Sequence, residues 1–288
     1  MQEGMESSRH SGYHNIHDPG FRPDAAGHLR MHSTIRHEQS GETASSLRLV
    51  LTLIALLWVL SDIGFYFLLP ALGQTASYNE NPIGTSLYYV FWVGIAVITF
   101  WPQYARWQRV SRWRMFGNRL TSIAVWSLAF IAAMAFLAYL PKLPPIDLQG
   151  VTFREGFTLP ELPLANGWYF LPKSVEILFQ QLLVVALVLA MASEGIRVGK
   201  IALYCGLLFG GTHLLLAFGD VPVGYVIRFA FLAGLFGLTI PYLILRVPNG
   251  FAYSYAIHWG YYAATVMMAR IVGPEAVLTI IRSLFDLS

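Results

Sequence analysis

Cysteine and charged side chains are both scarce in this chain. Cys205 is the sole cysteine among 288 residues, which excludes an intrachain disulfide and leaves the redox compartment open. Charged residues make up only 12% of the sequence, about half of what a soluble domain carries, while 56% of the residues are hydrophobic. The arginines are unevenly placed along the chain, so the net charge of +3 reflects membrane topology rather than nucleic-acid binding.

Apolar runs close to the ~20 residues that a helix needs to cross the hydrocarbon recur along the chain. We therefore predict an all-α, polytopic membrane protein with seven spans near Leu49–Leu72, Ile83–Trp101, Leu120–Leu140, Leu171–Ala192, Val198–Phe218, Val223–Leu245 and Phe251–Val272. The second, fourth and sixth connections hold the basic residues Arg106, Arg109, Arg112 and Arg114, then Arg197 and Lys200, then Arg246. The positive-inside rule then places the amino terminus in the cytoplasm. We expect a multi-pass protein of the inner (plasma) membrane.

The segments outside the transmembrane domain, 47–273, are polar or rich in proline. Residues 1–46 lack apolar periodicity and are predicted to be a disordered cytoplasmic tail. Their histidines match no closed zinc-site spacing: His10, His14, His17, His28, His32 and His37. The long connection Pro141–Phe170 fits a lid or a passive linker equally well. Residues 274–288 are predicted to form a short interfacial helix.

One acid and two histidines lie within three different apolar segments. Glu176 stands in the fourth, His213 in the fifth and His258 in the seventh. An ionisable group inside a membrane helix is costly and therefore points to a function. Each has a neighbour four residues away on the same helix face, in the pairs Glu176–Gln180, Phe209–His213 and His258–Tyr262. Such a set can activate water directly as a general base, or hold a metal ion such as Zn²⁺ that does so.

These three segments, within residues 171–272, resemble the three motifs of the CPBP family of intramembrane peptidases, which includes the CAAX prenyl endopeptidases. The family's Glu-Glu-x-x-x-Arg motif reads Val175 to Gln180 here, its Phe-x-x-x-His motif is Phe209 to His213, and its His-x-x-x-Asn motif is His258 to Tyr262. The resemblance implies a helical bundle in which Glu176 and His213 position or activate water, while His258 and Tyr262 stabilise the oxyanion. The implied activity is hydrolysis of a peptide bond in a membrane-associated protein or peptide. No cofactor, or Zn²⁺ held by Glu176, His213 and His258, is compatible with it.

Three positions depart from the family pattern. Val175 replaces the glutamate taken to activate water, Gln180 replaces the arginine, and Tyr262 replaces the asparagine. Glu176 therefore lacks the family's cation, and a buried acid without a cation tends to be protonated and unable to act as a base. These losses favour a second class of function, a catalytically silent relative that binds a membrane partner. A transporter is a third class, without support from an inverted repeat.

Two further charges fall inside predicted spans, Asp62 in the first and Arg228 in the sixth. They are expected to form a structural pair, or else Arg228 supplies the missing cation and Asp62 the missing acid. Helix depth predicts that His258 lies ~10 Å deeper in the membrane than Glu176 and His213.

Overall fold

The structure is a computed structural model that describes residues 47–115, 119–146, 161–218 and 223–285, with side chains within 47–107, 120–146, 161–217 and 223–272. All of its described regular elements are helices, and they belong to one compact unit, Ser45–Ser288. The predicted tail 1–46 with its six histidines lies outside the described residues. The same holds for the middle of the long connection, residues 147–160.

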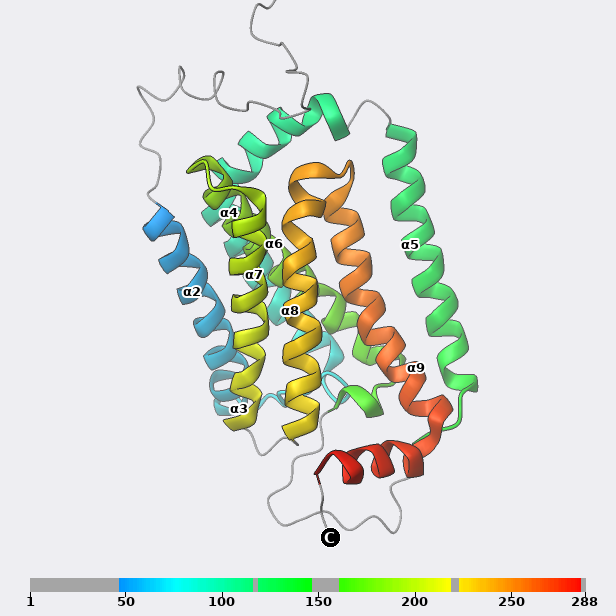
Figure 1. The fold of residues 1–288 in the computed structure, drawn as a ribbon. Coiled ribbons are helices and arrows are strands. Elements are labelled where there is room, and N and C mark those ends of the chain that lie inside the picture. Colours follow the sequence, from blue (N-terminus) through cyan, green and yellow to red (C-terminus); the bar gives the residue numbers. More distant parts are fainter. Residues whose placement is uncertain (1–46, 116–118, 147–160, 219–222, 286–288) are drawn as a thin grey trace, which may run out of the picture. The chain divides into compact units, whose positions relative to one another are not determined.

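Six helical segments are long and apolar enough to span a membrane: Leu47–Ala71, Pro82–Trp107, Leu120–Lys142, Gly167–Ser193, Val198–Ala217 and Val223–Arg246. They correspond to the first six predicted spans and make the protein a multi-pass, helical membrane protein. The helices are α2 (Leu47–Ile63) with α3 (Leu69–Ala71), α4 (Pro82–Met115), α5 (Arg119–Tyr139), α6 (Phe170–Ser193), α7 (Val198–His213) and α8 (Val223–Arg246) (Figure 1). A π-helical turn, Gly64–Leu68, joins α2 to α3.

The seventh predicted span lies within α9 (Gly250–Phe285), which is helical but is not among the six apolar segments. Tyrosine, serine and histidine side chains lower its apolar content, and Ser254 and His258 are buried in the bundle instead of facing lipid. The helix also continues through Pro274, where a separate interfacial helix was predicted. Its last part, red in Figure 1, is set at an angle to the part before it.

Helix α4 is longer than the predicted span and bends. Its backbone leaves helical geometry at Phe100 (φ −106°, ψ 15°), two residues before Pro102. Proline lacks an amide hydrogen and its ring collides with the preceding turn, which accounts for the bend. Because the helix runs on to Met115, Arg106 belongs to its extension and not to an irregular connection.

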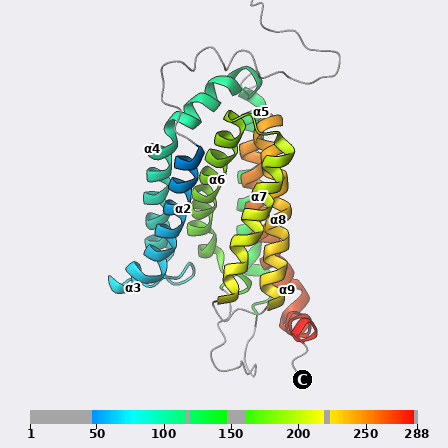
Figure 2. The same ribbon diagram turned by 60° about the vertical axis from the view of Figure 1, so that its left-hand side comes forward.

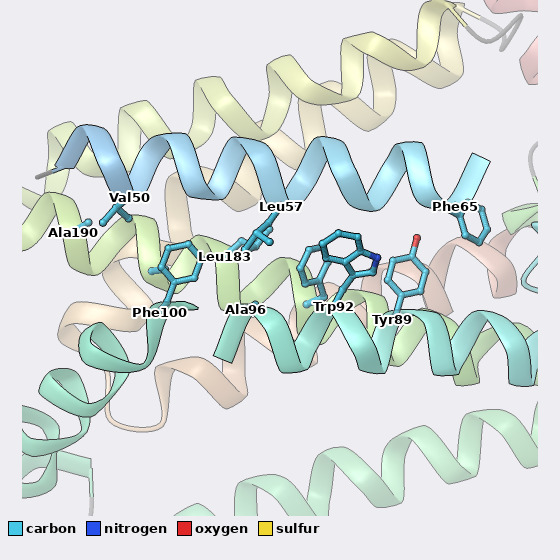
Figure 3. Packing of buried hydrophobic residues seen from close by; sticks show 11 residues of the cluster. Val50, Leu57, Phe65, Tyr89, Trp92, Ala96, Phe100, Leu183 and Ala190 are labelled. Atoms are coloured by element: carbon cyan, nitrogen blue, oxygen red, sulfur yellow. The ribbon is translucent and has the colours of Figure 1, made fainter. Parts of the chain in front are cut away.

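Helix α6 lies at the centre of the bundle (Figure 2). Of its most apolar window 67% is buried, against 6% for α5. One buried cluster joins α6 to α2 and α4 through Leu57, Trp92, Phe100 and Leu183 (Figure 3). The other face of α6 packs on α7 and α8, with Val185, Ile201 and Ile240 in a second cluster. Polar groups on α6 are therefore held between apolar layers that fix their orientation.

Helices α7 and α8 approach closely along a row of glycines. A Cβ atom on Gly210 would lie 2.9 Å from the carbonyl oxygen of Ala230, and one on Gly237 would lie 2.5 Å from that of Cys205. Gly206 and Gly210, four residues apart on α7, therefore form a small-residue pair that faces a neighbouring helix. This contact fixes α7, and with it Phe209 and His213, against α8.

Candidate functional site

Glu176 is a buried acid whose two carboxylate oxygens are both engaged. Lys173 Nζ lies 2.6 Å from Oε2, and the hydroxyl of Tyr78 donates to the same oxygen at 2.9 Å. The Gln180 amide donates to Oε1 at 2.8 Å, as the predicted i,i+4 pairing requires. Three donors surround the carboxylate, so it is satisfied without any group outside the protein.

The cation beside Glu176 is Lys173, which corrects the expectation that this acid has none. The side chains of Lys173 and Glu176 are 9% and 11% exposed, and they stand three residues apart on one face of α6. That spacing is visible in the sequence and could have identified the pair. The ammonium also lies 4.4 Å from the ring centroid of Tyr262, a cation–π contact.

Tyr78 comes from the connection between α3 and α4 and was not predicted from the sequence. Its hydroxyl shares a hydrogen bond of 2.9 Å with that of Tyr89 and donates to Glu176. Burial, and after it the negative charge of Glu176, raises the pKa of the Tyr78 phenol well above its usual range. Tyr78 therefore stays protonated and remains a hydrogen-bond donor.

His258 is held by α6. Its Nδ1 shares a hydrogen bond of 3.1 Å with the Gln181 amide, whose oxygen accepts from Ser254 Oγ at 3.1 Å. Gln181 is fully buried and stands five residues beyond Glu176, which puts His258 ~8 Å further along α6. This agrees with the deeper position expected for His258. The Nδ1 atom of His258 is thus occupied by a hydrogen bond within the protein.

His213 occupies the last position of α7. Its Nδ1 lies 2.7 Å from the carbonyl oxygen of Phe209, one turn earlier. Its ring stacks on Phe229 of α8, with centroids 6.0 Å apart. The carbonyl is an acceptor, so Nδ1 carries the proton and closes the end of the helix.

The three motif segments meet through ring contacts. Phe209 lies 6.4 Å from the ring of His213 and 6.5 Å from that of His258. The His258 and Tyr262 rings are 5.5 Å apart, and Tyr262 is the ring below the Lys173 ammonium. A continuous path of contacts therefore runs from Glu176 to His213. We call the residues along this path the junction. They are Lys173 and Glu176 of α6, Phe209 and His213 of α7, and His258 and Tyr262 of α9.

The proposed metal set is not formed by this arrangement. Within the part of the chain that the structure describes, no group of three or more His, Cys, Asp or Glu side chains is placed to hold a metal ion. The two oxygens of Glu176 already accept from Lys173 and Gln180, and a metal would have to displace them.

The expected Asp62–Arg228 pair is also absent. Lys173–Glu176 is the one ion pair among the residues whose side chains are described. Asp62 and Arg228 are both exposed, and α7 lies between their helices, α2 and α8 (Figures 1 and 2). Asp62 instead hydrogen-bonds with Trp58 on its own helix. Arg228 is therefore not the cation beside Glu176, because Lys173 occupies that position.

Comparison of this chain with protein-family models, with curated proteins and with solved structures finds no match. The resemblance to CPBP peptidases therefore rests on the motif residues themselves.

Proposed function

We propose that this chain is a CPBP-like protein of the inner (plasma) membrane that binds a membrane-associated protein or peptide at the junction without cleaving it. The proposal rests on the ion pair and the hydrogen bonds that occupy the carboxylate of Glu176. A general base must take a proton from water, and the ammonium of Lys173 at 2.6 Å neutralises the charge that would draw that proton. Tyr78 and Gln180 cover the carboxylate further.

The position of the family's water-activating glutamate supports the same conclusion. Val175 stands there, half-buried against the apolar cluster of α2, α4 and α6. A valine cannot accept a proton. The junction has the polar groups of a binding site, with Lys173 and Glu176 at one end and His258 fixed by Gln181.

The proposal is tested by photo-crosslinking in lipid nanodiscs. A benzophenone residue replaces Tyr66, which is exposed on the π-helical turn after α2 beside Phe65, with ring centroids 5.1 Å apart. Synthetic peptides with one lipid anchor should give saturable adducts there, and their masses should show no new peptide ends. The matched control carries the benzophenone at Leu128, which is exposed on α5. Equal labelling at both positions, or cleavage of the peptides, would contradict the proposal.

Peptide hydrolysis is the second candidate, favoured by the way His258 is held. Gln181 fixes one of its nitrogens, and Phe209 contacts the rings of both histidines. In this candidate Glu176 and His213 act on water, and His258 and Tyr262 stabilise the oxyanion. Glu176→Gln should then lower cleavage of anchored peptides by roughly 10²- to 10⁴-fold, and a chelator would reveal any need for zinc.

A further inference from the structure

The ring of Tyr78 sits in a cage of side chains from four different elements. Its centroid lies 5.4 Å from that of Phe65, 6.2 Å from Tyr89 and 5.3 Å from Tyr169. The ammonium of Lys173 stands 4.9 Å from the same centroid. Aromatic walls and a cation over the ring face together favour an electron-rich ring.

The cage recognises the hydroxyl as well as the ring. The phenol oxygen lies 2.9 Å from Glu176 Oε2 and 2.9 Å from the hydroxyl of Tyr89. A site built to hydrogen-bond a hydroxyl discriminates strongly against an analogue that lacks it, because its polar groups are left unpaired. The arrangement is therefore specific for a phenol and not for any apolar ring.

Tyr78, which fills the cage, lies in the connection between α3 and α4. Most of the side chains around it lie in helical segments of the bundle. Two hydrogen bonds join this connection to the segment that precedes α6. The backbone N–H of Tyr78 donates to Glu161 Oε2 at 2.9 Å, and the backbone N–H of Asn166 donates to Asn79 Oδ1 at 3.1 Å. Two of the walls have contacts beyond Tyr78, since Phe65 and Tyr89 are buried members of the apolar cluster around α6, whereas Tyr78 packs against that cluster and is only partly buried. Connections open at lower free energy than packed helices, so Tyr78 can leave while the walls remain.

We propose that the cage is a binding pocket for the phenol of a tyrosine on the membrane-associated partner, and that Tyr78 fills it until that partner displaces it. The inference rests on the proposed binding function and names the chemistry of the partner. The exchange replaces one phenol by another, so Glu176 and Lys173 keep their contacts throughout. A tethered occupant competes at an effective concentration in the mM range, so a free phenol binds the native protein weakly.

The first test vacates the cage. Tyr78→Ala protein in nanodiscs is titrated with 4-methylphenol and with toluene, its analogue without the hydroxyl, and binding is followed by saturation-transfer NMR. We expect 4-methylphenol to bind Tyr78→Ala at least tenfold more tightly than toluene does, and at least tenfold more tightly than it binds the native protein. Tyr139→Ala, which removes an exposed tyrosine of α5, is the control and should bind like the native protein. Equal binding of the two ligands, or no gain over the native protein, would overturn the inference.

The second test needs no change at Tyr78 and is independent of how that variant folds. Anchored peptides that contain one tyrosine are compared with the same peptides containing phenylalanine, by crosslinking at position 66. At least tenfold more adduct with tyrosine is expected. Equal adducts would overturn the phenol pocket and leave the binding function standing. No adduct with any peptide, together with selective binding of 4-methylphenol to Tyr78→Ala, would overturn the binding function and leave the pocket.

Discussion

Removing the ammonium of Lys173 should destabilise the protein more than any surface change. In Lys173→Met the carboxylate of Glu176, 11% exposed, loses a partner at 2.6 Å. Breaking a buried ion pair on one side costs roughly 3–5 kcal/mol, because the other charge stays buried and unpaired. Tyr78 and Gln180 still donate to Glu176, so we expect a loss near the lower end, ~3 kcal/mol. That loss is about a hundredfold in the unfolding equilibrium, measurable by titration with dodecyl sulfate in mixed micelles.

Two further variants separate the charge pair from general damage to the helix. Lys200→Met alters an exposed lysine of α7 and should change the free energy of unfolding by less than ~0.5 kcal/mol. The double variant Lys173→Met with Glu176→Met removes both charges and should unfold within ~1 kcal/mol of the native protein. A double variant as unstable as Lys173→Met, or a single variant as stable as Lys200→Met, would refute the reasoning.

Other perturbations address packing, hydrogen bonding, ionisation and topology. Gly237→Ala should cost ~1–3 kcal/mol in the same unfolding titration, since its Cβ would meet a backbone oxygen at 2.5 Å, whereas Gly211→Ala meets nothing within 4 Å and should be tolerated. Gln181→Leu should cost ~1–3 kcal/mol by leaving a buried imidazole unpaired, and a loss under ~0.5 kcal/mol would count against that bond. The phenol of Tyr78 has a raised pKa, so its contribution to stability is complete below pH ~10 and declines as the pH rises further. Ultraviolet titration of the native protein minus Tyr78→Phe should accordingly show a phenolate only above the pH at which exposed tyrosines ionise. A reporter fused after Gln108 should read as cytoplasmic, and an external signal would contradict the topology.

The sequence predicts best what depends on periodicity along one helix. Six of the predicted spans coincide with helices long and apolar enough to cross a membrane, because long apolar runs define both. The Glu176–Gln180 bond and the His258–Tyr262 ring contact follow from i,i+4 spacing alone. Helix ends are predicted less well. Pro102 is visible in the sequence and indicates the bend of α4, but the helix continues beyond it to Met115.

Contacts between elements could not be predicted in the same way. Which residue of α6 meets His258 depends on how the two helices are rotated and shifted, and the sequence carries no local sign that it is Gln181. Tyr78 lies in an irregular connection, whose path has no period to follow. Lys173 is different, since its i,i+3 spacing to Glu176 can be read from the sequence, whereas the family motif has its cation at position 180.

The central claim is that the junction binds an anchored peptide and that Glu176, paired with Lys173, does not activate water. The most direct measurement follows cleavage of one tyrosine-containing anchored peptide by mass spectrometry, for the native protein, Glu176→Gln and the double variant Val175→Glu with Gln180→Arg. The account predicts crosslinked but intact peptide for the native protein and for Glu176→Gln, with new peptide ends only where the second acid and its arginine are restored. Cleavage by the native protein that Glu176→Gln abolishes would contradict it.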